Sequence, residues 1–136
     1  MSDHVLVWLL LEQDGAALLG LRKAGRPPFA GSWVLPGDEM PEEESASETL
    51  ARFARDQLDL SVASEEFADT INLVEAGDAY AVNIFRVTGG QPRFRESGPY
   101  SDVRWLTSED LGDATAYPMP EALRRSLASA IERRPT

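Results

Sequence analysis

The chain has 136 residues, 43% of them hydrophobic, which suits a single domain over residues 1–136 and leaves no room for a second domain of ordinary size. Its 13 Lys and Arg are outnumbered by 23 Asp and Glu, so the net charge of −10 repels polyanions, and nucleic acid is not an expected partner. A small phosphorylated ligand stays open, because a divalent cation can bridge protein carboxylates to phosphate oxygens.

The chain contains no Cys, which excludes disulfides, thiolate metal sites and a thiol nucleophile, and fits a reducing cytoplasm. The apolar run from Val5 to Leu11 is too short to span a bilayer, and neither a basic leader nor a small-residue cleavage site accompanies it. We therefore expect a buried strand there and no membrane partner.

Two strands are predicted to open the chain as a hairpin, because two apolar runs flank a cluster of turn-forming residues. Gly and Pro then forbid regular structure over a loop of ten residues, and a short strand follows, ended by Pro36-Gly37. The elements predicted up to this point are a strand from His4 to Glu12, a turn at Gln13-Asp14-Gly15, a strand from Ala16 to Arg22, a loop from Lys23 to Ser32 and a strand from Trp33 to Leu35.

The clearest helix is predicted from Glu43 to Leu58, a stretch without Gly or Pro. At about 100° per residue its apolar residues gather on one side, with Phe53 at the margin of the apolar arc. The opposite side carries charges, and Glu48 to Arg52 and Arg52 to Asp56 are spaced for ion pairs. A solvated helix face accounts for that ladder by itself.

The second half of the chain is predicted to be rich in strands and to end in an amphipathic helix with Pro in its first turn. Strands mixed with two substantial helices indicate an α/β fold, in which helices cover both faces of a mixed β-sheet. The elements predicted here are strands from Phe67 to Val74, Tyr80 to Val87 and Val103 to Leu106, a helical turn from Ser108 to Leu111 capped by Ser108, and a helix from Pro120 to Arg134.

The segment from Gly31 to Leu60, GSWVLPGDEMPEEESASETLARFARDQLDL, carries a recognisable pattern. Together with the preceding Pro28-Phe29-Ala30, it resembles the signature of the Nudix hydrolases, the MutT-like superfamily, and its lead-in. With Asp38 at the signature's first Gly, Glu44 falls on the first Glu and Arg52 on the Arg. The resemblance implies the Nudix α/β/α sandwich over the whole chain.

The sequence departs from the signature where the chemistry of the family lies. Phe53 replaces the Glu after the Arg, Asp56 and Gln57 replace the Glu pair, and Asp59 replaces the second Gly. Members of the family use those Glu residues to hold Mg²⁺ or Mn²⁺ and to orient or deprotonate the water that attacks a diphosphate. The metal neutralises developing phosphate charge and makes its bound water more acidic. We therefore expect weak binding of Mg²⁺ or Mn²⁺.

The resemblance implies catalytic roles for Glu44, Arg52, Asp56 and Asp102, and metal ligation by the Gly37 carbonyl, Asp56 and Asp102. Asp102 is included because many relatives place an acidic loop residue there that acts as ligand or base. Glu44 and Arg52 also fit a purely structural pair that ties the loop to the helix.

Aromatic and histidine side chains outside the signature have two interpretations each. Tyr80, Phe85 and Tyr100 could stack on a nucleobase, although aromatic residues in strands are usually core. Trp33 and Trp105 are interpreted as core or pocket walls. His4 has no partner motif, and we interpret it as structural.

Two functions stay open. The first is a metal-dependent hydrolase that cleaves the phosphoanhydride of a nucleoside diphosphate linked to another moiety, weakened by the lost carboxylates. The second is a non-catalytic module that binds a small nucleotide-type ligand or a partner on the same fold. Many relatives form homodimers, so a homodimer is a further expectation, and no residue specifies its interface.

Overall fold

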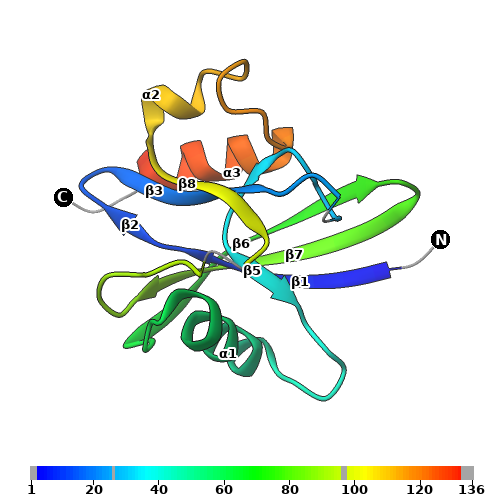
Figure 1. Cartoon of the computed structure of the whole chain (residues 1–136), viewed down its shortest axis with the longest axis vertical. Coiled ribbons are helices and arrows are strands. Elements are labelled where there is room, and N and C mark those ends of the chain that lie inside the picture. The colour runs from blue at the N-terminus through cyan, green and yellow to red at the C-terminus, as the bar shows by residue number, and fades with distance from the viewer. Residues whose placement is uncertain (1–2, 26, 96–97, 133–136) are drawn as a thin grey trace.

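The computed structural model describes residues 3–25, 27–95 and 98–132, which form two four-stranded sheets and three helices. Figure 1 shows α1 on one side of the strands and α2 and α3 on the other. The helices are α1 (Ala46–Leu58), α2 (Ser108–Leu111) and α3 (Glu121–Glu132). This arrangement confirms the predicted α/β/α sandwich. Within the described ranges, no helix is long and apolar enough to cross a membrane.

The first sheet, here called the mixed sheet, has the order β5-β1-β7-β6. β1 runs parallel to β7, whereas β5 pairs antiparallel with β1 and β6 pairs antiparallel with β7. All residues from Leu6 to Leu11 are buried, as expected of a central strand covered on both faces. The strands are β1 (Asp3–Leu10), β5 (Gly37–Glu39), β6 (Ser64–Glu75) and β7 (Asp78–Thr88).

The second sheet, here called the antiparallel sheet, is built around β3, which pairs with β2, β4 and β8. Asp14 and Gly15 both have positive φ and form the tight turn between β2 and β3. The strands are β2 (Glu12–Gln13), β3 (Ala16–Arg22), β4 (Trp33–Val34) and β8 (Tyr100–Thr107).

The predicted opening hairpin is wrong in its first strand. The chain divides near Leu11, so that β1 enters the mixed sheet beside β7 and only the short β2 pairs with β3. Partners far along the chain determine this pairing. The second strand of the prediction, Ala16 to Arg22, is confirmed without change.

Helix boundaries differ from the prediction by a few residues. α1 begins at Ala46 and not at Glu43, because Ser45 caps it. The cap of α2 is Thr107 and not Ser108. α3 begins at Glu121, one residue after Pro120; residues 133 and 134 of the predicted helix lie outside the described residues.

Candidate functional site

The start of α1 is fixed by a reciprocal pair of hydrogen bonds between Ser45 and Glu48. The Glu48 amide donates to Ser45 Oγ at 3.1 Å, and the Ser45 amide donates to Glu48 Oε1 at 2.9 Å. Such a capping box satisfies two helix N–H groups that otherwise lack partners. Glu48 is therefore used at the helix end, and Glu44 is left in the loop just before it.

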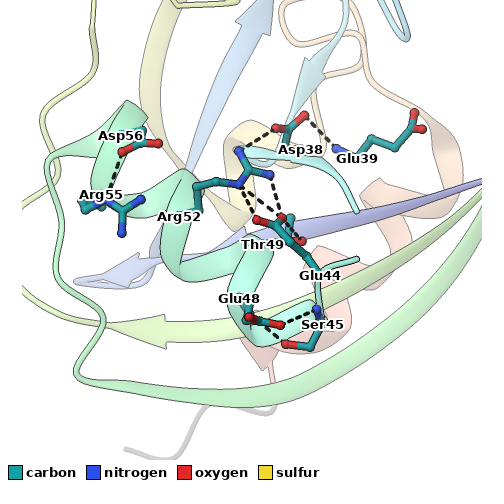
Figure 2. Close-up of polar contacts among 9 residues, drawn as sticks. All are labelled: Asp38, Glu39, Glu44, Ser45, Glu48, Thr49, Arg52, Arg55 and Asp56. Carbon is teal, nitrogen blue, oxygen red and sulfur yellow. Dashed lines mark hydrogen bonds and ion pairs between the residues drawn. The ribbon is translucent and has the colours of Figure 1, made fainter. Parts of the chain in front are cut away.

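Glu44 and Arg52 form a bidentate ion pair between this loop and the helix (Figure 2). Arg52 Nε lies 3.0 Å from Glu44 Oε2, and Arg52 Nη2 lies 3.0 Å from Oε1, which also accepts a 2.9 Å hydrogen bond from the buried Thr49 hydroxyl. The hydrogen bonds from Arg52 and Thr49 lower the pKa of Glu44, and the carboxylate raises the pKa of Arg52. This is the contact expected of a pair that ties the loop to the helix.

Asp38 extends the tie on the other side of the Arg52 guanidinium. Its Oδ2 lies 3.4 Å from Arg52 Nη1, and its Oδ1 accepts the Glu39 amide at 2.8 Å. In Figure 2 the Arg52 side chain points toward Asp38 and Glu44 and away from Asp56. The start of β5, the loop and the helix are thus joined through one guanidinium group.

The two ion pairs predicted along the helix face are not among its contacts. Arg52 turns to Glu44 and Asp38, Glu48 caps the helix, and Asp56 lies 3.0 Å from Arg55 Nε on the exposed surface. Helical spacing places such side chains within reach of one another. Here Arg52 pairs with Glu44 in the loop and not with Glu48 or Asp56 on the helix.

Several signature residues line one cavity beside α1, here called the helix pocket. It is lined by Arg22, Gly37, Asp38, Arg52, Phe53, Asp56, Gln57 and Pro99. Of the predicted site residues, the structure therefore brings Gly37, Arg52 and Asp56 together. Phe53 is buried at 3% exposure, as expected for a residue that extends the apolar face of the helix.

The structure places Asp102 apart from that group. It is the third residue of β8. Its carboxylate accepts the Val103 amide at 2.8 Å and lies 3.1 Å from Arg104 Nε. It lines a different surface pocket, together with Lys23, Phe94 and Arg95. Glu44 likewise lies outside the residues that line the helix pocket. The four residues predicted as catalytic are therefore not one cluster.

The helix pocket offers the oxygen donors that a hard divalent cation prefers, but it contains only two carboxylates, those of Asp38 and Asp56. Across the described parts of the chain, no three acidic or histidine side chains gather as a metal site. The pocket offers the carboxylates of Asp38 and Asp56 and neutral oxygens from Gly37 and Gln57. Mg²⁺ needs only one or two protein carboxylates when substrate phosphates and waters complete its coordination. The donor set therefore suits a metal that arrives with a phosphorylated ligand.

A second cavity, here called the aromatic pocket, lies beside the helix pocket. Apolar and aromatic side chains from β1, β4 and the loop after β3 form its walls, as is usual for small-molecule sites. Arg22, Gly37 and Asp38 line both cavities. The aromatic pocket is lined by Leu6, Trp8, Arg22, Pro27, Pro28, Phe29, Val34, Leu35, Gly37, Asp38, Glu39 and Tyr100.

Arg22 is a functional candidate that the sequence analysis missed. The sequence pattern gives it only as the last residue of a strand. In the structure, a register shift between Leu21 and Arg22 makes the pairing of β3 with β8 irregular at this point. β-Bulges of this kind redirect a side chain next to binding sites. The cationic residue at the end of the strand, just before a Pro-rich loop, was the available signal.

Of the aromatic candidates Tyr80, Phe85 and Tyr100, Tyr100 alone is among the residues that line the aromatic pocket. Tyr80 is buried and Phe85 is partly buried, so both fit the alternative interpretation as core residues. Trp33 is buried at 4% exposure and Trp105 is partly buried, as interpreted. His4 does have partners: its Nδ1 lies 3.0 Å from Glu39 Oε1, and its ring stacks on Tyr80 at 4.8 Å.

Comparison with known proteins identifies relatives over nearly the whole chain. The model of the NUDIX domain matches residues 2–129. A Mycobacterium tuberculosis protein named "Putative 8-oxo-dGTP diphosphatase 2" is 29% identical over 125 residues, which cover 86% of this chain and 83% of the relative. The nucleoside triphosphatase NudI of Escherichia coli is 25% identical, with 93% of this chain and 96% of the relative covered.

Solved structures show the same fold. The MutT NUDIX hydrolase from Burkholderia pseudomallei superposes with a TM-score of 0.78 at 23% identity, covering 93% of this chain and 97% of that one. The MutT protein from Methanosarcina mazei gives a TM-score of 0.81 at 18% identity, covering 97% and 94%. At these identities the likeness concerns the fold alone. The match of the NUDIX model to most of the chain, however, shows that the protein belongs to the NUDIX domain family.

Proposed function

We propose that the protein is a metal-dependent hydrolase that cleaves the phosphoanhydride of a nucleoside diphosphate linked to another moiety. In a nucleoside triphosphate that moiety is a phosphoryl group, and relatives carry the names of a nucleoside triphosphatase and an 8-oxo-dGTP diphosphatase. The observation that carries the proposal is the sharing of Arg22, Gly37 and Asp38 by the two pockets. A nucleoside in one pocket would have its phosphates in the other.

Each pocket contributes a different part of binding. The walls of the aromatic pocket include Trp8, Phe29 and Tyr100, which offer aromatic surface to a base. Arg22 stands at the junction, where a guanidinium group can donate two hydrogen bonds to a phosphate. A nucleotide therefore meets apolar surface at one end and cationic and carboxylate groups at the other.

In the helix pocket, Asp38, Asp56 and the Gly37 carbonyl would hold the divalent cation. Mg²⁺ or Mn²⁺ would neutralise phosphate charge and make its bound water more acidic. Asp56 would orient the attacking water, whose oxygen forms a new bond to phosphorus while the bridging P–O bond breaks. Arg52 and Glu44 would hold the loop and the helix in register around that carboxylate. The proton released by the water passes to a carboxylate or to solvent.

The test is calorimetric titration of Mg²⁺ and Mn²⁺, with and without a non-hydrolysable ADP-ribose analogue, in wild type and Asp56→Asn. Glu43→Gln is the matched control, because it removes one charge from an exposed residue outside the helix pocket. The proposal expects metal affinity that rises with the analogue and falls in Asp56→Asn alone. A panel of nucleoside di- and triphosphates, ADP-ribose and dinucleotides that gives no turnover with either metal would overturn it.

Asp102 needs its own test because it lies outside the helix pocket in this structure. If it serves as a ligand or base, Asp102→Asn lowers kcat. Arg104→Gln is the appropriate comparison, since it breaks the same ion pair and leaves the carboxylate in place. An equal loss of kcat in the two variants would show that the ion pair matters and that the carboxylate has no separate role.

A second candidate is a nucleotide-binding module without hydrolysis, favoured by the burial of Phe53 where the signature has Glu. Gln57→Glu tests it, because this substitution adds one carboxylate to the helix pocket with hardly any change of shape. Gln91→Glu adds the same charge at an exposed site outside the pocket and serves as control. A wild type that binds nucleotide without turnover, and becomes active in Gln57→Glu, would support the binding module.

The homodimer and the cytoplasmic location stay predictions, as does the lack of affinity for nucleic acid. Sedimentation of the purified chain at several concentrations would decide its oligomeric state. A titration with duplex DNA at low salt would decide the last point, because non-specific binding is strongest there.

A further inference from the structure

We propose that Tyr100 is a positioning residue for this site: its hydroxyl fixes the Gly37 backbone, and its ring supports the Arg22 guanidinium where the two pockets meet. This inference rests on the proposed function, since it assigns a role in the same site. It concerns a residue outside the signature, contributed by β8 of the antiparallel sheet.

The first contact joins the two sheets at the beginning of β5. The Gly37 amide donates to the Tyr100 hydroxyl at 3.2 Å. β5 is an edge strand of the mixed sheet and pairs only with β1, so an amide on its outer side needs a partner elsewhere. Tyr100 supplies that partner at the residue whose carbonyl is proposed to bind the metal. A change in the hydroxyl would therefore move the peptide groups around Gly37.

The second contact is between the Arg22 guanidinium and the face of the Tyr100 ring. The guanidinium carbon lies 5.9 Å from the centroid of the Tyr100 ring, within the range of a cation–π contact. The irregular register of β3 and β8 brings Arg22 opposite Tyr100. The Phe94 ring packs against the Tyr100 ring in a T-shaped arrangement, with the two ring centroids 5.7 Å apart. The ring and the Pro27 carbonyl, which accepts a 3.0 Å hydrogen bond from Arg22 Nη2, together hold the guanidinium at the junction of the two pockets.

Gly20 shows how closely the ring is seated. A Cβ atom at Gly20 would lie 2.5 Å from Tyr100 Cδ1 and 2.7 Å from its Cγ, which no side chain tolerates without a shift. A Gly in the interior of a strand weakens the strand and commonly marks such a close approach. The space above Gly20 is thus reserved for this ring, and the ring cannot move toward β3.

The chemistry of the hydroxyl supports positioning and argues against catalysis. Burial raises the pKa of Tyr100 to about 12, so the phenol stays protonated at neutral pH. A protonated phenol can accept the Gly37 N–H bond and is a poor base or nucleophile. Tyr100 therefore acts through Gly37 and Arg22.

The experiment compares Tyr100→Phe with Tyr80→Phe. Both tyrosines are 8% exposed, and Tyr80 is not among the residues that line either pocket. Exchange of the Gly37 amide is followed by NMR, and affinity for α,β-methylene-ADP with Mg²⁺ is measured with kcat and KM on a substrate from the panel. Losing one hydrogen bond should accelerate Gly37 exchange and lower kcat by roughly 2- to 10-fold in Tyr100→Phe only.

Two further variants separate the hydroxyl from the ring. Tyr100→Leu should raise the Kd and KM for the nucleotide beyond the values of Tyr100→Phe, because Arg22 loses its cation–π contact with the ring. Gly20→Ala should displace the ring and reproduce part of both effects while Tyr100 itself is kept.

Tyr100→Phe that matches Tyr80→Phe in Gly37 exchange, or that exchanges faster yet keeps wild-type kcat and affinity, would overturn the inference. A wild type that neither binds nor hydrolyses any tested nucleotide would overturn the proposed function instead. The exchange measurement needs no ligand, so it decides the role of the hydroxyl at Gly37 in either case.

Discussion

Arg52 binds both carboxylate oxygens of Glu44, with its Nε 3.0 Å from Oε2 and its Nη2 3.0 Å from Oε1, across eight residues of sequence. Bidentate geometry of this kind fixes orientation as well as distance. The loop that carries Glu44 therefore has one allowed position relative to α1, and with it the edge of the helix pocket.

The ion pair should make stability depend on pH in a defined window. The hydrogen bonds from Arg52 and Thr49 lower the pKa of Glu44 in the folded protein. A carboxyl group of this kind contributes stability that is present above its unfolded pKa of about 4.3 and is lost as pH falls through the folded pKa. Glu44→Gln should therefore be less stable than wild type at neutral pH, and the difference should shrink in acid.

Urea unfolding at a series of pH values measures that difference. Glu43→Gln is the control, because Glu43 is an exposed neighbour in the same loop. A gap between Glu44→Gln and wild type that stays constant from neutral to acid pH would contradict the assigned hydrogen bonds.

Gly37→Ala should destabilise the protein by about 1–3 kcal/mol or more, because added volume has nowhere to go. A Cβ atom there would lie 2.1 Å from the Val7 carbonyl oxygen and 2.6 Å from Trp8 Cδ1. Gly112→Ala is the matched control, since its Cβ would meet nothing nearer than 3.4 Å. Denaturant midpoints of the two variants provide the measurement, and equal midpoints would show that β1 yields easily at this point.

Phe53→Glu should restore a carboxylate of the signature and lose stability, by roughly 2–4 kcal/mol, through lost packing and a charge at a buried position. Phe53 is 3% exposed in the apolar face of α1. Phe53→Leu keeps an apolar side chain and should cost less than about 2 kcal/mol. Thermal unfolding of both variants tests the expectation. A stable Phe53→Glu protein would mean that the side chain reaches the helix pocket with little penalty.

Arg22→Ala should weaken nucleotide binding by about 10-fold, the value of one charge-assisted hydrogen bond, with a smaller change in kcat. The prediction follows from the position of Arg22 in both pockets. Arg125→Ala removes the same charge from an exposed site on α3, where the side chain is 77% exposed. Titration with α,β-methylene-ADP compares the two. Equal losses of affinity would reduce the role of Arg22 to a general charge effect.

The sequence predicts local elements well and long-range partners poorly. Residues Ala16 to Arg22 and Ala46 to Leu58 carry their structure in their own pattern of apolar residues and caps, and both are found within a few residues of expectation. Strand β1 has an equally clear pattern, but its partners on β7 lie 76 positions further on, as the pairing of His4 with Tyr80 illustrates. Nothing local to β1 specifies that partner.

The same distinction applies to the site. The signature spacing predicts Gly37, Arg52 and Asp56, which share one pocket, because a helix and its preceding loop form a single local unit. Arg22 and Tyr100 come from two other strands, and they meet only through the pairing of β3 with β8. Asp102 also lies on β8, and its carboxylate contacts Arg104, two residues further along the same strand. Register is a property of the folded sheet, so single-sequence spacing does not reveal it.

The parallel pairing of β1 with β7 has a consequence for the newly made chain. β1 is synthesised before its parallel partner β7, which spans Asp78–Thr88. Long-range pairing of this kind slows folding, because a large loop must close before the contacts form. Until then the apolar part of β1, from Leu6 to Leu10, has its edge toward β7 exposed, and β5 can cover only the other edge. Aggregation during synthesis should therefore begin at β1. Chains that stop before residue 78 lack β7 and should aggregate most.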